Sequence, residues 1–311
     1  MNRHFDCDEA RAMVAAFSAR GSQEEKTLPP MVAPGQTSEF SVTPFELPTC
    51  YRLTSKDDLD QEICLRIIGV ICSKVLPPLL NKPRIQSDRD LRNLRQFVKV
   101  TGLGDPSFEV AMEGVREIFS KFEYVHGAER LIGVEAKLYE GELALDCHSR
   151  YFTDRERAPH EKHIPFPELV DPKHILEDIR GPAFIHGPDN HVEYYSKSFD
   201  GGHPRYDPID PAILKEGDIV ELSISFMSVP IKNGNFRLVT SLRAVALLSN
   251  ETRKKSEAAR TLETVTPHIA VSPSKGRKLK RRSLFSLAER PLKQSRSAFE
   301  VDTSEGDVEL E

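Results

Sequence analysis

The chain has 311 residues, of which 39% are hydrophobic and 29% are charged, and its formal net charge is -5. This length accommodates one large domain or two small ones, and the apolar fraction is sufficient for a buried core. A net charge this small excludes a whole-chain electrostatic argument for binding nucleic acid or a membrane surface, so any such argument must come from local clusters.

Cysteine use and the lack of long apolar runs indicate the compartment in which the chain works. The five cysteines are scattered and form no CxxC pair. This pattern is typical of reduced thiols in an intracellular protein and not of a disulfide framework or a zinc knuckle. No stretch approaches the roughly 18 apolar residues of a membrane-spanning helix, so we expect no membrane partner.

The composition of residues 1–54 predicts a mostly disordered arm. A run rich in Pro, Ser and Thr occupies residues 27–48, and such a run buries too little apolar surface to fold. One short helix is expected within the arm, because four apolar residues share one side of it: Ala10, Met13, Val14 and Phe17.

Helical periodicity dominates the next segment. The first predicted helix spans 57–76 and ends at the two prolines that follow it. The second spans 88–100 and begins with the capping pair Ser87 and Asp90.

A third predicted helix begins at Asp105, a typical N-cap residue. Pro106 occupies the first helical position, and apolar residues recur on one face as far as Phe122. The three helices therefore form an all-helical segment at 57–122, ahead of the strands.

Beyond residue 130 the apolar period falls from 3.6 to 2, which predicts strands. In the first hairpin a two-residue turn at Glu140 and Gly141 pairs 138 with 143, 136 with 145 and 134 with 147. A short helix is expected around 173–179. The second hairpin is expected from arms at 183–186 and 191–195.

The third hairpin occupies residues 217–248 and has an Asn-Gly sequence at its turn. A plain two-residue turn would pair apolar residues of the first arm with polar residues of the second. We therefore predict an extra residue at the turn or a bulge at Pro230. The predicted pairs are Phe226 with Leu242, Ile224 with Ala244 and Leu222 with Ala246.

Helices followed by six strands in three hairpins predict an α+β fold with an antiparallel β-sheet of barrel type. Irregular segments between the hairpins favour a small, partly open barrel of the oligonucleotide-binding kind (OB-like) over an immunoglobulin sandwich. We expect the folded domain to span 55–249, with its β region at 130–248, and a disordered tail to span 250–311.

The tail has two parts of opposite charge. Residues 250–298 contain thirteen Lys and Arg against four Asp and Glu, whereas residues 299–311 contain six acids and no base. Such blocks are typical of solvated interaction tails. Within the basic part, KGRKLKRR resembles a nuclear localisation signal read by importin. Its cations are Lys275, Arg277, Lys278, Lys280, Arg281 and Arg282.

Three hydroxyl groups near this signal are candidate phosphorylation sites. Thr266 and Ser272 precede prolines, and Ser283 follows two arginines. Phosphate at these positions would weaken importin or nucleic-acid contacts by adding negative charge. The expected location is nuclear, with shuttling to the cytoplasm left open.

Histidine supplies one enzyme alternative. The motif HEKH contributes His160 and His163, and the second predicted hairpin places His186 opposite His191. Zinc needs three or four ligands, however, and the HEKH motif lies in a proline-rich loop and not on a helix. We therefore expect no metal and no cofactor.

Like charges meet in the first predicted hairpin. Glu135 lies opposite Asp146, with His148 diagonal to them. A cation or an incoming base would relieve this conflict, and simple solvation of an exposed face explains it as well. Because no phosphate loop or nucleophile elbow is found, we expect a protein that is not an enzyme.

Features typical of nucleic-acid binding are spread along the chain. Single-strand binders combine aromatic faces that stack on bases with cations that follow the phosphates. The second predicted helix is basic, and the sheet region interleaves aromatic and cationic residues. A solvated helix face and core aromatics are the alternative interpretations. The candidate residues are Arg92, Arg95, Lys99, Tyr194, Tyr195, Lys197, Arg205, Tyr206, Arg237 and Arg243.

Four segments, RGPAFIHG, FDGGHPRYDP, GDIVELSISFMSVP and NFRLVTSLRAVALL, are similar to uncharacterised proteins of mushroom-forming fungi. The resemblance covers residues 176–248. It implies a folded unit that ends near Leu248, and it brings no established activity.

The leading hypothesis is a non-enzymatic nuclear protein that binds nucleic acid, expected to be single-stranded, through a barrel face and the basic tail. A protein–protein adaptor or scaffold module with disordered arms is the first alternative. An enzyme with an unrecognised, metal-dependent site is the second. The expected partners are DNA or RNA, importin through the basic tail, and other proteins.

Overall fold

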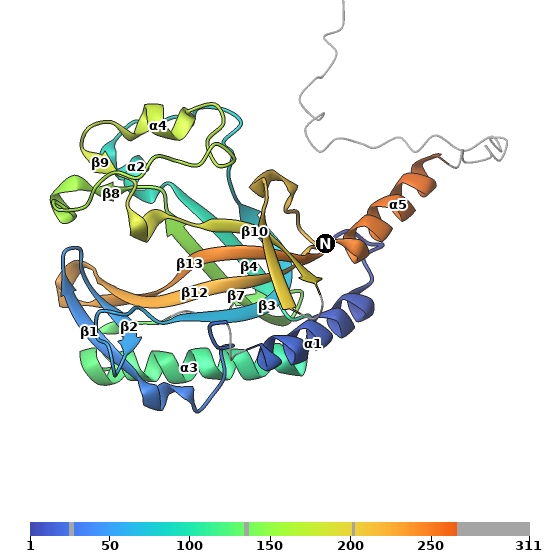
Figure 1. The fold of residues 1–311 in the computed structure, drawn as a ribbon, viewed down its shortest axis with the longest axis horizontal. Helices are drawn as coiled ribbons and strands as arrows, with labels where there is room; N and C mark the ends of the chain where they lie inside the picture. Colours follow the sequence, from blue (N-terminus) through green and yellow to red (C-terminus); the bar gives the residue numbers. More distant parts are fainter. Residues whose placement is uncertain (25–27, 134–136, 201–202, 266–311) are drawn as a thin grey trace, which may run out of the picture. The chain divides into compact units, whose positions relative to one another are not determined.

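The computed structural model describes residues 1–24, 28–133, 137–200 and 203–265 (Figure 1). Its helices are α1 (Cys7–Gln23), α2 (Asp88–Asn93), α3 (Pro106–His126), α4 (Ile175–Arg180) and α5 (Glu251–Val265). Its strands are β1 (Phe40–Glu46), β2 (Thr49–Ser55), β3 (Cys64–Val75), β4 (Arg95–Thr101), β5 (Leu131–Ile132), β6 (Lys137–Tyr139), β7 (Glu142–Arg150), β8 (Thr153–Asp154), β9 (Phe184–Ile185), β10 (Glu193–Asp200), β11 (His203–Pro208), β12 (Ile219–Pro230) and β13 (Phe236–Ser249). Residues 1–265 form one compact unit.

Five of the strands close into a ring. β3 pairs with β4, β4 with β7, β7 with β13, β13 with β12, and β12 with β3 again. All of these pairings are antiparallel except that of β7 with β13, which is parallel and rests on the single pair His148 and Ser241. The ring is therefore a barrel that is loosest between β7 and β13.

The α+β class is confirmed, whereas the expected count of six strands is wrong. The main sheet has 11 strands, because the β1–β2 hairpin extends it beyond β12, the β10–β11 pair extends it beyond β13, and the short strands β5 and β6 pair with β13 and β7. Within the sheet β10 runs parallel to β13, so the sheet is mixed and not purely antiparallel. Figure 1 shows α3 along one side of the sheet and α4, with β8 and β9, on the opposite side.

The predicted helix at 57–76 is wrong, because these residues contain the strand β3. Leu65, Ile67 and Ile71 point into the main core, while Ile68 and Val70 point outwards and pack against α1. A strand covered on both faces is apolar at consecutive positions, and such a run also satisfies helical spacing.

The predicted helix at 88–100 is correct only in its first part. The capping box of Ser87 and Asp90 opens α2 as expected, but the helix ends at Asn93 and β4 begins at Arg95. Pairing with β3 on one side and β7 on the other makes residues 95–101 a strand.

The third predicted helix is confirmed as α3. The carboxylate of Asp105 accepts a hydrogen bond from the Ser107 N–H at 2.9 Å, and Pro106 is the first helical residue. The buried face of α3 includes Phe108, Val115 and Phe122. The predicted short helix around 173–179 is also present, as α4.

Of the predicted hairpins, the first has the expected register. Leu138 pairs with Leu143 across a turn in which Glu140 and Gly141 both have positive φ. The other two pairs of this prediction involve residues 134 and 136, which lie outside the described residues. The second predicted hairpin is wrong, because β9 pairs with β8 and β10 pairs with β11 and β13.

The predicted register of the third hairpin is also wrong. The observed pairs include Phe226 with Thr240, Ile224 with Leu242, and Leu222 with Val245. The bulge is not at Pro230 but between Ser223 and Ile224, with a second between Ile219 and Val220. Because each bulge inserts one residue, the apolar residues of both strands stay on the core face despite the different turn.

The structure extends further at both ends than the sequence indicates. Residues 7–23 and 40–55, expected in a mostly disordered arm, form α1, β1 and β2. Residues 251–265, expected in the tail, form α5, and its Arg253 binds Asp218 of the barrel. The predicted localisation signal and the three phosphorylation candidates lie outside the described residues. In the described part of the chain, no helix is both long and apolar enough to cross a membrane.

Candidate nucleic-acid interface

The outer face of β4 and β7 carries a mixed row of cations and rings. Alternate residues of β4 point into the core, so Arg95, Phe97 and Lys99 point out. Each of them has a direct cross-strand partner on β7: Arg95 pairs with Arg150, Phe97 with His148, and Lys99 with Asp146. We call these six residues the outer face.

Two like charges meet at one end of this face. Arg95 and Arg150 are directly opposed and exposed, an arrangement that destabilises a sheet unless an anion lies between the charges. Neither guanidinium has a hydrogen bond or ion pair within the described part of the chain; the Arg95 guanidinium carbon lies 6.0 Å from the centroid of the Phe97 ring. Partial burial and the nearby charges of Arg157 and Arg95 lower the pKa of Arg150 below its ordinary value.

His148 is an uncharged ring within this site. Burial, together with the charges of Arg95 and Arg150, lowers the pKa of His148 to about 4. The imidazole is therefore neutral at neutral pH, and it lies beside the arginines as an uncharged ring with hydrogen-bonding nitrogens.

Next to the opposed arginines the surface forms a cavity of about 500 Å³, which we call the arginine cavity. Arg95, His148 and Arg150 line it from β4 and β7, and Arg237 lines it from β13. An apolar wall comes from the end of β12 and the turn after it. The wall residues are Met227, Val229, Pro230 and Ile231.

Two acids also line the cavity, but both already bind arginines. Asp154 accepts a hydrogen bond from Arg92 Nε at 2.7 Å and lies 3.8 Å from Arg157 Nε. Asp189 accepts hydrogen bonds from both terminal nitrogens of Arg52.

The arginine cavity therefore carries excess positive charge. Within residues 1–24, 28–133, 137–200 and 203–265, Arg95, Arg150 and Arg237 have no acidic partner. Three uncompensated guanidiniums on one cavity are a typical arrangement for binding phosphate groups.

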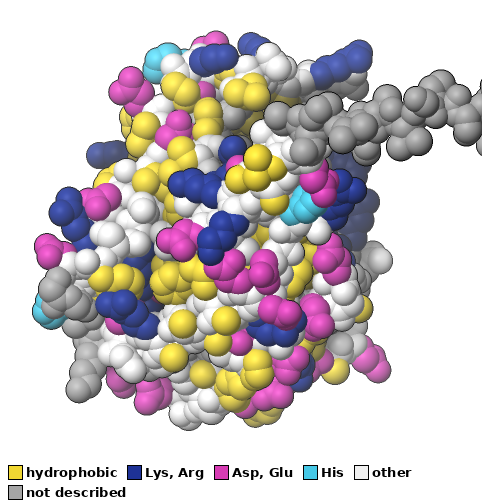
Figure 2. Space-filling model, turned by 90° about the vertical axis from the view of Figure 1, so that its right-hand side faces the viewer, with side chains coloured by type: hydrophobic (Ala, Val, Ile, Leu, Met, Phe, Trp, Pro, Cys, Tyr) yellow, Lys and Arg dark blue, Asp and Glu magenta, His cyan; other side chains and the backbone are white. Residues whose placement is uncertain are grey.

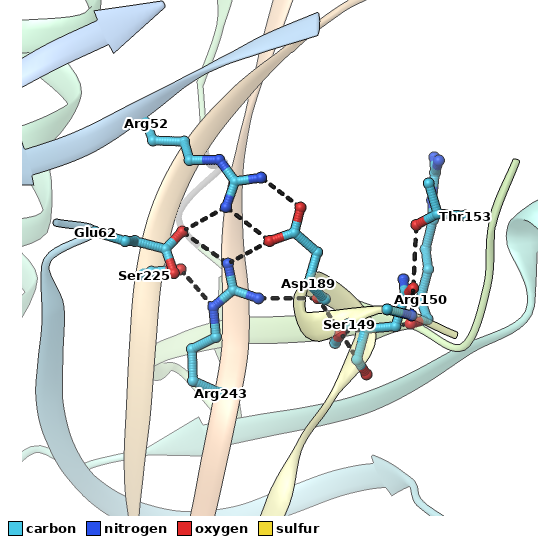
Figure 3. A network of polar contacts seen from close by, with 10 residues as sticks. Arg52, Glu62, Ser149, Arg150, Thr153, Asp189, Ser225 and Arg243 are labelled. Atoms are coloured by element: carbon cyan, nitrogen blue, oxygen red, sulfur yellow. Dashed lines mark hydrogen bonds and ion pairs between the residues drawn. The ribbon is translucent and has the colours of Figure 1, made fainter. Parts of the chain in front are cut away.

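A network of ion pairs forms the wall of the cavity at Asp189 (Figure 3). Arg52 and Arg243 both reach Glu62, at 3.2 and 2.7 Å, and both reach Asp189. Arg243 also donates to Ser225 Oγ at 3.0 Å. Burial alone would raise the pKa of Asp189, but its hydrogen bonds to Arg52 and the nearby charge of Arg243 hold that pKa below its ordinary value. The network is balanced in charge and fixes the turn at 188–190 to β2 and β13.

Exposed apolar groups accompany the cations. Phe97 is half-buried and is not among the residues that pack against the core. Its neighbour across the β3–β4 pairing is Val75, which is 57% exposed. The outer face thus presents an aromatic ring between Arg95 and Lys99, the combination that single-strand binders use.

Of the candidates predicted from the sequence, three lie at this site. Arg95 and Lys99 are on the outer face and Arg237 lines the cavity, although Lys99 is paired with Asp146 at 3.4 Å. Arg92 lies beside the cavity and binds Asp154.

Three of the remaining candidates have partners within the fold. Tyr194 is buried, and its hydroxyl donates to Gln96 Oε1 at 2.6 Å. Lys197 is buried between Glu24 and Glu221, and Arg243 belongs to the network at Asp189. Tyr194, Lys197 and Arg243 are therefore engaged by groups of the protein itself.

The β10–β11 pair does not form a basic surface either. Tyr206 donates to Glu221 Oε1 at 2.9 Å and packs edge-on against Tyr195, while Arg205 binds Asp207. Figure 2 shows one side of the molecule, on which acidic and basic side chains are interspersed.

Sequence reasoning missed Phe97 and Arg150, and it placed His148 beside Glu135 and Asp146 and not beside the arginines. Their signal is a spacing of two residues, shared by Arg95 and Phe97 on one strand and by His148 and Arg150 on the next. The spacing becomes visible only when residues 95–101 are interpreted as a strand.

The histidine alternative has a structural explanation. His163 Nε2 lies 3.0 Å from Glu177 Oε2, and His186 Nδ1 lies 2.9 Å from the Tyr151 carbonyl oxygen. Among the residues that the structure describes, no three His, Cys, Asp or Glu side chains are grouped to hold a metal ion.

Comparison with solved structures gives distant similarities, among them two single-stranded DNA-binding proteins. No protein-family model matches the chain, and no curated protein matches it. The single-stranded DNA-binding protein of bacteriophage Enc34 is 10% identical, with a TM-score of 0.30, over 67% of this chain and 88% of that chain. The single-stranded DNA-binding protein gp2.5 of bacteriophage T7 is 10% identical, with a TM-score of 0.31, over 59% of this chain and 86% of that chain. Similarity at this level establishes neither a family nor an activity for this chain.

Proposed function

We propose that this protein binds single-stranded nucleic acid across the outer face of β4 and β7 and into the arginine cavity. The observation that carries the proposal is the directly opposed, uncompensated pair Arg95 and Arg150 beside the half-buried ring of Phe97. Phosphates neutralise the two guanidiniums, and a base stacks on the ring.

The strand order of the ring supports this location. The ring has five strands, as oligonucleotide-binding barrels do, and β4 and β7 are its second and third strands in chain order. In such barrels these two strands form the ligand face, and the loops after the first and fourth strands flank it. Here those loops precede β4 and follow β12, and each contributes to the arginine cavity, through Asn93 and Ile231.

The test is binding of a fluorescently labelled single-stranded oligonucleotide, measured by anisotropy over a range of salt concentrations. Removing two phosphate contacts in the double variant Arg95→Gln/Arg150→Gln should reduce the slope of log K against log salt by about 1.4, since each contact contributes about 0.7 on single strands. Phe97→Ala should cost about 1–3 kcal/mol of binding free energy with the slope unchanged.

A matched control is Arg116→Gln, which removes one charge from the exposed face of α3, outside the arginine cavity. It should leave both affinity and slope unchanged. No binding by the full chain at low salt would overturn the proposal, and so would a double variant that binds like the wild type.

We further propose that the basic segment 275–282 directs the protein to the nucleus through importin. The support is its cluster of cations, which suits the acidic pockets of that receptor. A fluorescent fusion should lose nuclear accumulation when Lys278, Lys280, Arg281 and Arg282 are all changed to alanine. Unchanged accumulation would refute this assignment.

A further inference from the structure

The uncompensated positive charge of the arginine cavity is larger than the negative charge of one internal phosphate. Arg95, Arg150 and Arg237 come from three different strands and line one cavity. An internal phosphodiester carries one negative charge, whereas a phosphate monoester carries nearly two at neutral pH. Three guanidiniums therefore match a phosphate monoester better than a single bridging phosphate.

The cavity also has a closed wall. The turn at 188–190 is joined to β7 by the Ser149 hydroxyl, which donates to the Asp189 carbonyl oxygen at 3.3 Å. The same turn is joined to β13 by Arg243, which donates to that carbonyl oxygen at 2.9 Å, and to β2 by Arg52 (Figure 3). These hydrogen bonds fix the position of the wall.

The size and lining of the cavity suit a single terminal nucleotide. Its volume of about 500 Å³ lies within the usual range for small-ligand sites. Met227, Val229 and Ile231 form an apolar side against which a sugar and base can pack, and Arg237 lies beside Val229 across the β12–β13 pairing. His148 adds an uncharged ring nitrogen for a hydrogen bond to the phosphate or the sugar.

We infer that the arginine cavity holds the phosphorylated end of a nucleic-acid strand, as a terminal phosphate monoester with its nucleoside. The inference rests on the proposed function, since the rest of the strand then lies along the outer face. The three arginines bind the terminal phosphate, and the apolar wall receives the terminal nucleoside.

Three oligonucleotides of one sequence test the inference: one with a 5′ phosphate, one with a 3′ phosphate and one with neither, each labelled internally. With the full-length protein, one phosphorylated end should bind at least about tenfold more tightly than the unphosphorylated strand, because it adds charge-assisted hydrogen bonds. Arg237→Gln should bring that ratio towards one, and Arg116→Gln should leave it unchanged.

The outcomes separate this inference from the proposed function. If all three strands bind equally, and binding still depends on Arg95 and Arg150, the site takes internal phosphates and the inference is overturned while the proposed function stands. If none binds at low salt, the proposed function fails as well. A mononucleotide that competes as strongly as the phosphorylated strand would show a free-nucleotide site and overturn the assignment to a strand end.

Discussion

Relieving the charge conflict between Arg95 and Arg150 should stabilise the free protein. Like charges directly opposed on neighbouring strands cost about 0.2–1 kcal/mol, and neither guanidinium has an acidic partner in the described part of the chain. Arg150→Gln removes one charge and keeps the first methylenes of the side chain. We therefore expect its free energy of unfolding to rise by about 0.2–1 kcal/mol, while binding of single-stranded nucleic acid weakens.

Urea denaturation of the free protein at low and high salt measures this effect. The gain should shrink at 1 M salt, where the screening length falls to about 3 Å. Arg150→Lys keeps the charge and should show no gain. Lys99→Gln should instead lower the free energy of unfolding. Lys99 is paired with Asp146 at 3.4 Å, and its loss removes a favourable contact of up to about 1 kcal/mol.

The reasoning is refuted if Arg150→Gln lowers the stability of the free protein at low salt. That result would mean that the Arg150 side chain stabilises the fold in the absence of ligand. If the variant gains stability but binds nucleic acid with unchanged affinity, the two arginines do repel each other, but they do not contribute to nucleic-acid binding.

Two further predictions concern buried charge and pH. Glu221→Gln should destabilise the fold by about 3–5 kcal/mol, because the buried cations Arg66 and Lys197, bound to Glu221 at 2.9 and 3.0 Å, then share the single carboxylate of Glu24. A loss below about 1 kcal/mol in urea denaturation would contradict this. Burial lowers the pKa of His186 to about 4. The unfolded chain therefore binds a proton that the folded chain excludes, and stability on the order of 3 kcal/mol is lost as the pH falls from about 6.5 to about 4. His186→Gln should remove part of this loss of stability, whereas His160→Gln, at an exposed position, should not. If stability falls with pH equally in the two variants, the assignment of the loss to His186 is wrong.

Three local signals in the sequence were interpreted correctly. The capping pair Ser87 and Asp90, the N-cap Asp105, and the turn at Glu140 and Gly141 all act through contacts within a few residues. Such contacts depend on the chain nearby and not on the rest of the fold, so a short window of sequence is enough to predict them.

Long-range pairing decided what the sequence left ambiguous. The apolar run of β3 satisfies helical spacing, and it is a strand because α1 covers its outer side while the ring core covers its inner side. The register of β12 against β13 depends on two bulges that the residues of the turn do not predict.

Part of the candidate site was also predictable from the sequence, and part depended on the tertiary structure. Composition and alternation indicated a barrel and a supply of cations and aromatics. The sequence by itself determined the starts of α2 and α3, the first hairpin turn and the α+β class. Only the tertiary structure decided which cations remain uncompensated. Arg243 and Lys197 are neutralised by acids distant in the chain, whereas Arg95 and Arg150 are placed against each other by the pairing of β4 with β7. The physical reason is that a charge is neutralised only when an opposite charge lies close to it in space. The closure of the barrel determines which residues become neighbours.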